Sequence, residues 1–103
     1  MNDGLFDYTL EDVREVQVLR ERFGQEVVLV DDEGESVVFR ILTEFSLGKV
    51  MYAALQTDEL ERRNEFGLYR IGMNRGGEPE LETIEDDDEW ENVSELVDEM
   101  LFS

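Results

Sequence analysis

The chain has 103 residues with 28 acidic and nine basic side chains, giving a formal net charge of −19 at pH 7. It contains no His and no Cys, which excludes disulfides, thiolate metal sites and catalysis by a cysteine nucleophile or a histidine base. Hydrophobic residues make up 41% of the chain, so the composition predicts one folded domain over residues 1–103 rather than a disordered acidic chain.

The first part of the chain is predicted to hold a helix over residues 9–24. Residues 1–8 form a lead-in from which Leu5, Phe6 and Tyr8 are able to dock onto the core. Thr9 is a suitable N-cap and Gly24 a suitable terminator. Between them, one helical face collects the apolar side chains Leu10, Val13, Val16 and Leu19.

A β-meander is predicted over residues 26–84. The apolar run 27–30 leads into the turn residues Asp-Asp-Glu-Gly, after which the sequence alternates, with Phe39, Ile41 and Phe45 on one side of a strand. Further strands are expected at 50–56 and 66–73, with a short fifth strand at 81–84. The polar stretch 57–65 fits either a loop or a single helical turn.

An amphipathic helix is predicted over residues 86–101. Its apolar stripe has helical spacing and consists of Trp90, Val93, Leu96, Val97, Met100 and Leu101. The predicted fold is therefore α+β: a small antiparallel β-meander of four to five strands, with the C-terminal helix packed on one face and the N-terminal helix on that face or at an edge. Apolar residues on the second face also permit helical cover on both sides; they are Val38, Leu42, Met51 and Leu55.

Several segments in order carry a family resemblance. They are residues 28–45, Lys-Val-Met-Tyr-Ala-Ala-Leu at 49–55, Leu-Tyr-Arg-Ile at 68–71 and Leu-Glu-Thr-Ile-Glu-Asp-Asp-Asp-Glu-Trp-Glu-Asn-Val at 81–93. In this layout the chain resembles the YrzB-like family of small acidic bacterial proteins, which has no known function and more often carries Phe where Trp90 stands. The resemblance implies a cytoplasmic bacterial protein and transfers no catalytic residue.

The charge is unevenly placed along the chain. All nine bases lie at or before Arg75, and residues 76–103 hold twelve acids and no base, so this segment carries −12. Such a field repels nucleic acid and anionic membranes and attracts cationic protein surfaces. The expected partner is thus a basic protein surface, such as that of a nucleic-acid-binding protein, with no direct binding to nucleic acid or membrane. The N-terminus has no signal-peptide pattern, which favours a cytoplasmic location.

The candidate partner-binding residues surround the start of the C-terminal helix. Trp90 has two interpretations: an anchor of the helix in the core, or an aromatic contact for a basic partner flanked by acids. The candidate set is Glu82, Glu85, Asp86, Asp87, Asp88, Glu89, Trp90, Glu91 and Glu95. An exposed strand edge favours a weak homodimer and the like charge favours a monomer.

The sequence carries no clear pattern for catalysis, metal binding or cofactor binding. No catalytic residues, metal ligands or cofactor are predicted: the acid runs 31–35 and 85–89 fit a hairpin turn and a helix N-terminus better than a calcium loop. A weak divalent-cation binder stays an alternative, as does a nucleic-acid mimic that competes for a DNA- or RNA-binding site. The arginines, if clustered, are expected to be used in internal ion pairs.

Overall fold

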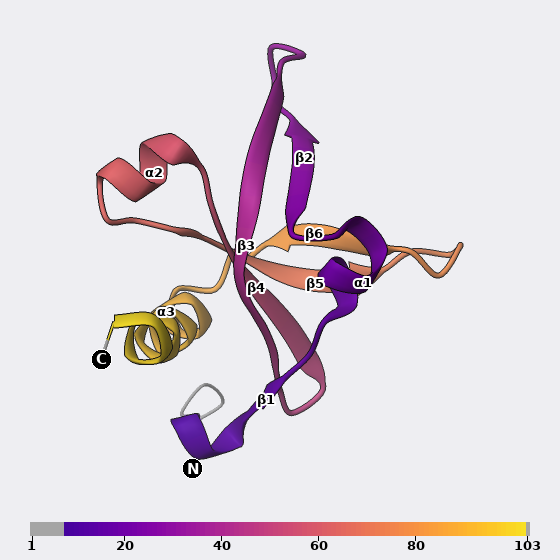
Figure 1. The fold of residues 1–103 in the computed structure, drawn as a ribbon. Coiled ribbons are helices and arrows are strands. Elements are labelled where there is room, and N and C mark those ends of the chain that lie inside the picture. The colour runs from indigo at the N-terminus through magenta and orange to yellow at the C-terminus, as the bar shows by residue number, and fades with distance from the viewer. Residues whose placement is uncertain (1–7, 103) are drawn as a thin grey trace.

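The computed structural model describes residues 8–102 as a six-stranded antiparallel sheet with helices on both faces (Figure 1). Leu5 and Phe6 lie outside the described residues. The elements in chain order are η1 (Leu10–Asp12), β1 (Val13–Glu15), α1 (Val18–Phe23), β2 (Glu26–Val30), β3 (Ser36–Leu47), β4 (Val50–Gln56), α2 (Asp58–Arg62), β5 (Gly67–Met73), β6 (Pro79–Thr83) and α3 (Asp87–Phe102).

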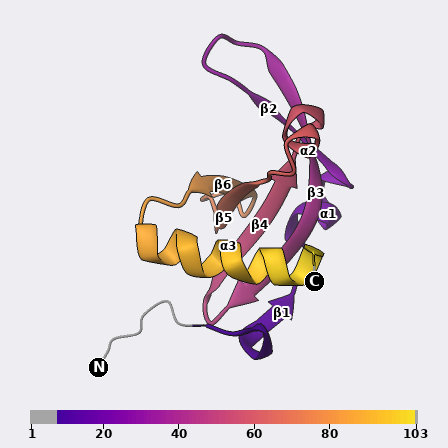
Figure 2. The same cartoon turned by 90° about the vertical axis from the view of Figure 1, so that its left-hand side faces the viewer.

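The five strands of the predicted meander are confirmed, and β1 is an additional strand. The main path through the sheet is β1-β3-β4-β5-β6, and β2 also pairs with β3. Strand β3 is long enough to hold β2 along residues 36–40 and β1 along residues 45–47, while β4 pairs with its other side from Arg40 onward. The β2–β3 hairpin therefore extends beyond β4, as Figures 1 and 2 show.

A bulge in β3 exchanges the two faces of this strand. The register with β4 shifts between Ile41 and Thr43, which leaves Leu42 as the extra residue. Before the bulge, Ile41 packs with Leu55; after it, Phe45 lies opposite Tyr52 on the other face. The prediction that Ile41 and Phe45 share one side is wrong, because an extra residue shifts the period-two alternation by one.

Helix α3 covers one face of the sheet, as predicted (Figure 2). Its buried Val93, Leu96 and Val97 pack in one cluster with sheet residues. Those sheet residues are Phe45, Leu47, Tyr52, Ala54, Leu68 and the nearby Ile84. The cluster joins strands β3 to β5 to the C-terminal end of the chain, so the helix and the sheet share one core.

Helix α1 covers the opposite face. Leu19 is fully buried in a second cluster with Val27, Ile41, Ala53, Leu55 and Ile71. Because Ala53 and Leu55 alternate along β4 with Tyr52 and Ala54 of the first cluster, the two clusters lie on opposite faces of the sheet. Cover on both sides, which the apolar second face permits, is therefore present. The prediction that the N-terminal helix packs on the α3 face or at an edge is wrong, and Leu42 packs against the α3 cluster rather than on the second face.

The predicted helix over residues 9–24 is wrong in its first half, since α1 begins only at Val18. Residues 13–15 instead pair with residues 45–47 of β3. The cause is a long-range contact: the buried Glu44 carboxylate accepts hydrogen bonds from the backbone N–H groups of Leu19 (2.6 Å) and Arg20 (3.0 Å). Glu44 thus caps α1 from the sheet and fixes the start of this helix at Val18. Gly24 ends the helix at φ +85°, as predicted.

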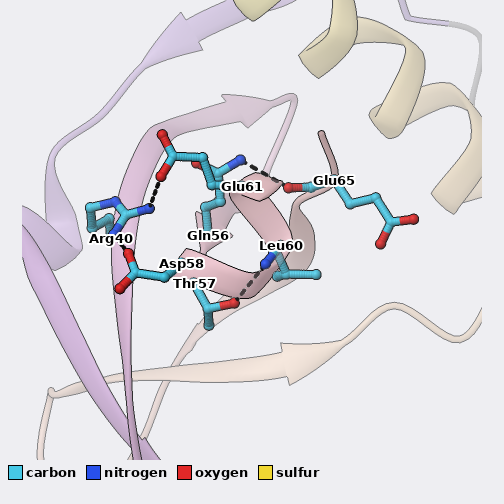
Figure 3. Close-up of polar contacts among 7 residues, drawn as sticks. All are labelled: Arg40, Gln56, Thr57, Asp58, Leu60, Glu61 and Glu65. Carbon is cyan, nitrogen blue, oxygen red and sulfur yellow. Dashed lines mark hydrogen bonds and ion pairs between the residues drawn. The ribbon is translucent and has the colours of Figure 1, made fainter. Parts of the chain in front are cut away.

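Residues 57–65, whose sequence fits either a loop or a single helical turn, contain the short helix α2. The Thr57 side chain accepts a hydrogen bond from the Leu60 N–H (3.0 Å), so Thr57 caps this helix (Figure 3). Arg40 of β3 binds both Asp58 (2.6 Å) and Glu61 (3.0 Å) of α2. The hydrogen bond between Arg40 and Asp58 raises the pKa of Arg40 and lowers the pKa of Asp58. Gln56 donates to the Glu65 carbonyl (2.9 Å) and closes the loop.

The cap on α1 gives a first test. Glu44→Ala leaves two N–H groups of α1 without their acceptor inside the protein, so we expect the free energy of unfolding to fall by about 2 kcal/mol or more. Glu33→Ala is the matched control, because Glu33 is exposed in the hairpin turn and its loss is expected to change stability by less than about 0.5 kcal/mol. Urea unfolding followed by circular dichroism measures both. Equal stabilities of the two variants would contradict the capping role.

Candidate functional site

The candidate residues lie around the first two turns of α3. The helix begins at Asp87, and the Asp86 side chain accepts a hydrogen bond from the Glu89 N–H (2.9 Å), so Asp86 is its N-cap. Asp87, Asp88 and Glu89 follow in the first turn, where the helix dipole favours negative charge. The predicted structural role of this acid run, as a helix N-terminus, is confirmed.

Glu89 does not lie on the surface with the other acids. Only 1% of it is exposed, and its carboxylate accepts hydrogen bonds from the Tyr52 hydroxyl (2.6 Å) and from Nε and Nη2 of Arg70 (both 2.7 Å). All three contacts come from the sheet face that α3 covers. The prediction that Glu89 belongs to the partner-binding surface is therefore wrong, because its oxygens dock α3 on the sheet.

Both side chains that bind Glu89 are held in their protonated forms. Burial and the Glu89 carboxylate raise the pKa of Tyr52 well above its ordinary value, so the hydroxyl stays protonated and donates. The hydrogen bond with Glu89 also raises the pKa of Arg70, which stays cationic. A bidentate arginine contact plus a hydroxyl donor satisfies a carboxylate that would otherwise be costly to bury.

Trp90 is 47% exposed and is not in the core. The interpretation of Trp90 as an anchor in the core is wrong, because Glu89 takes the inward position one turn before Val93. The buried stripe of α3 is Glu89, Val93, Leu96 and Val97. Trp90 follows Glu89 by about 100° around the helix and lies at the border of the stripe. A large aromatic side chain is thus presented to solvent next to the acids.

The remaining candidate acids are exposed. Glu85, Asp87, Asp88, Glu91 and Glu95 form, with Trp90, what we call the α3 acidic surface. Within residues 8–102, none of these five carboxylates forms an ion pair with a basic side chain. Glu82 is also exposed, but it lies on β6 opposite Arg70, with its carboxylate against Gly72. The structure brings the helical acids together and places Glu82 on the sheet.

The arginines lie on different elements rather than in one patch. Ion pairs join Arg22 to Glu78, Arg63 to Glu59 and Glu65, and the pairs of Arg40 and Arg70 have been described. Arg14 and Arg20 donate to backbone carbonyls, Arg20 to those of Ile41 and Leu42 at the bulge. Four of the arginines therefore form ion pairs within the protein, as predicted, whereas Arg14 and Arg20 bind backbone carbonyls instead. No helix of residues 8–102 is long and apolar enough to cross a membrane.

The acid run 85–89 does not gather ligands for a metal. Among the described residues, the carboxylates close enough for one ion belong to Asp31, Glu33 and Glu35 in the β2–β3 turn, within 4.8 Å of one another. One oxygen of Asp31 accepts the N–H groups of Glu33 and Glu35 (both 2.9 Å). The Asp31 carboxylate therefore has a structural role in the hairpin turn.

Comparison with known proteins finds one family. The model of the family described as "Protein of unknown function (DUF1292)" matches residues 32–101. The chain is 31% identical over 77 residues to a "UPF0473 protein" of Clostridium botulinum (strain Loch Maree / Type A3). This alignment covers 75% of this chain and 88% of that protein. No solved structure matches the chain. The matched region begins within the β2–β3 turn and runs through α3.

The docking contact of α3 gives a second test. Glu89→Gln removes a charge that Arg70 and Tyr52 both bind, so we expect the free energy of unfolding to fall by about 1.5–3 kcal/mol. Glu91→Gln, two residues away on the exposed side of the same helix, is expected to change it by less than about 0.5 kcal/mol. Urea unfolding followed by circular dichroism compares the two. A loss no larger for Glu89→Gln than for Glu91→Gln would contradict the docking role.

Proposed function

The chain belongs to the DUF1292 family of bacterial proteins of unknown function, and we propose that it is a non-enzymatic interaction module whose α3 acidic surface binds a basic surface on another cytoplasmic protein. We also propose that it belongs to the YrzB-like group in particular. The observation that carries the proposed binding is a half-exposed Trp90 beside carboxylates that have no basic partner among the described residues.

The combination of charge and an aromatic ring suits a protein interface. Tryptophan is enriched among the residues that contribute most to binding, and exposing it in water gives no gain in folding. The surrounding carboxylates accelerate encounters with a cationic surface and select against anionic ones. In this arrangement the acids govern association and salt dependence, while Trp90 supplies apolar contact area beside them.

The rigid background strengthens this proposal. Helix α3 is fixed by Glu89 and by three buried apolar residues, so the exposed acids keep constant spacing and a bound partner meets a preformed surface. Preorganisation of this kind lowers the entropy cost of binding. A flexible acidic tail of equal charge lacks this advantage.

A nucleic-acid mimic is the second candidate, and the spacing of the acids favours it. Asp88, Glu91, Glu95 and Asp98 are exposed and follow one another every three or four residues along α3. Successive carboxylates therefore rise by about 4.5–6 Å along the helix axis. A row of regularly spaced negative charges on one side of a rod is the feature that a phosphate-binding partner would recognise.

Matched charge changes test the proposed function. Glu85→Gln/Asp87→Asn/Asp88→Asn removes three charges from the α3 acidic surface and leaves the cap Asp86 intact, whereas Asp32→Asn/Glu33→Gln/Glu35→Gln removes three from the hairpin turn. Tagged proteins are used to capture partners from nuclease-treated bacterial lysate. We expect basic proteins that bind wild type at low salt and are released above about 0.15 M, where screening acts within about 8 Å. The first variant should lose them and the second should keep them.

Two further results distinguish the candidates. Trp90→Ala should weaken capture without changing its salt dependence, because it removes apolar contact but no charge. Added DNA or RNA should displace the partner only if the protein is a nucleic-acid mimic. Equal capture by both triple variants, or capture that is insensitive to salt, would contradict binding through the α3 acidic surface.

A further inference from the structure

A groove lies on the sheet face opposite α3, between α1, β2 and β6. Its volume is about 560 Å³, and its apolar lining includes Leu19, Phe23, Val27, Leu29 and Leu81. The charged residues of the lining are Glu26 and Glu80, and no basic side chain contributes to it. The groove is therefore apolar inside and negative at its sides.

One wall of the groove is an unpaired strand edge. The Ile41 N–H donates to Gln25 O (3.0 Å) and the Asp31 N–H to Glu35 O (2.9 Å), which fixes the alternation of the β2–β3 ladder. The backbone groups of Glu26, Val28 and Val30 consequently turn away from β3. No strand of residues 8–102 pairs with them. This edge offers donors and acceptors over a length of about 17 Å.

The two strand edges at the groove differ in how well they are protected against pairing with a further strand. The free edge of β6 carries Pro79, which has no N–H, and the acids Glu80 and Glu82. These are devices that block pairing with a further strand. The edge of β2 has no proline, and its Val28 and Val30 are exposed. An apolar edge of this kind is a template for strand addition.

From these observations we propose that the free edge of β2 binds an extended segment of a basic protein as an additional strand. Alternate apolar side chains of that segment enter the groove beside Val27 and Leu29, and the basic side chains between them meet Glu26 and the negative field of the protein. A second copy of this chain is disfavoured as the occupant, since each copy carries −19. The site lies on the other face from α3 and does not rest on the proposed function.

The test compares two peptides of equal composition. The alternating peptide Lys-Val-Lys-Val-Lys-Val-Lys can present one apolar and one basic side as a strand, while Lys-Lys-Lys-Lys-Val-Val-Val cannot. By fluorescence anisotropy we expect the alternating peptide to bind at least about tenfold more tightly, a ratio that one or two added hydrogen bonds supply. Amide hydrogen exchange should slow at Val28 and Val30. Equal affinity of the two peptides would overturn the proposal, because it would indicate attraction by charge alone.

Two variants locate the binding on the protein. Val28→Pro removes an N–H that points away from β3, so the ladder with β3 keeps its bonds while the preference for the alternating peptide is lost. Glu26→Gln/Glu80→Gln leaves the backbone unchanged and should weaken binding of the alternating peptide severalfold. This double variant takes the place of Val28→Pro if Val28→Pro does not fold. The preference should persist in Glu85→Gln/Asp87→Asn/Asp88→Asn. A folded Val28→Pro that retains the preference would overturn the proposal.

Sedimentation equilibrium of the chain alone provides the last result. We expect a monomer. A dimer that Val28→Pro dissociates would assign this edge to self-pairing and would overturn the proposal. Loss of lysate partners in the α3 variant bears on the proposed function alone, so the two proposals can fail separately.

Discussion

The docking of α3 through Glu89 is the contact on which the surface of this protein depends. A carboxylate with 1% exposure is tolerated only when its oxygens are satisfied, and here Arg70 and Tyr52 supply three hydrogen bonds. That requirement sets the rotation of the helix about its own axis. Once Glu89 faces inward, Trp90 must lie at the border and Glu91 and Glu95 must face solvent. The candidate site is thus a consequence of how the core is closed.

Both faces of the sheet use a buried carboxylate in this way. Glu44 caps α1 on one face and Glu89 docks α3 on the other, and both side chains are almost fully buried. In each case a single acid joins a helix to the sheet across a long distance in sequence. A chain with 28 acids and nine bases has few cations for such contacts, so it uses backbone N–H groups for Glu44 and a hydroxyl with one arginine for Glu89. The remaining acids are left to solvent, where their repulsion has the least cost.

The sequence predicted the features that depend on local pattern. The strands of the meander and helix α3 were found from alternation, turn residues and an apolar stripe of helical period. The split of residues 9–24 was not found, because β1 and the start of α1 depend on β3 and on Glu44, which lies far along the chain. The bulge at Leu42 shifts the alternation by one residue, and this shift was hidden because apolar side chains occupy both faces of β3 near it. At the site, the exposed acids were predicted, but Glu89 was grouped with them. Its position four residues before Val93 was the available signal, and a carboxylate at an inward position indicates a buried basic partner.

The most direct test of this account measures the surroundings of Trp90, the sole tryptophan of the chain. The experiment adds caesium or iodide as a quencher of its fluorescence, at matched low ionic strength. The account predicts that both ions reach the ring and that caesium quenches more efficiently than iodide, because the adjacent carboxylates attract the cation and repel the anion. The difference should narrow in Glu85→Gln/Asp87→Asn/Asp88→Asn. Protection from both ions would contradict the account by placing Trp90 in the core, and equal quenching by the two ions would contradict an acidic surface around it.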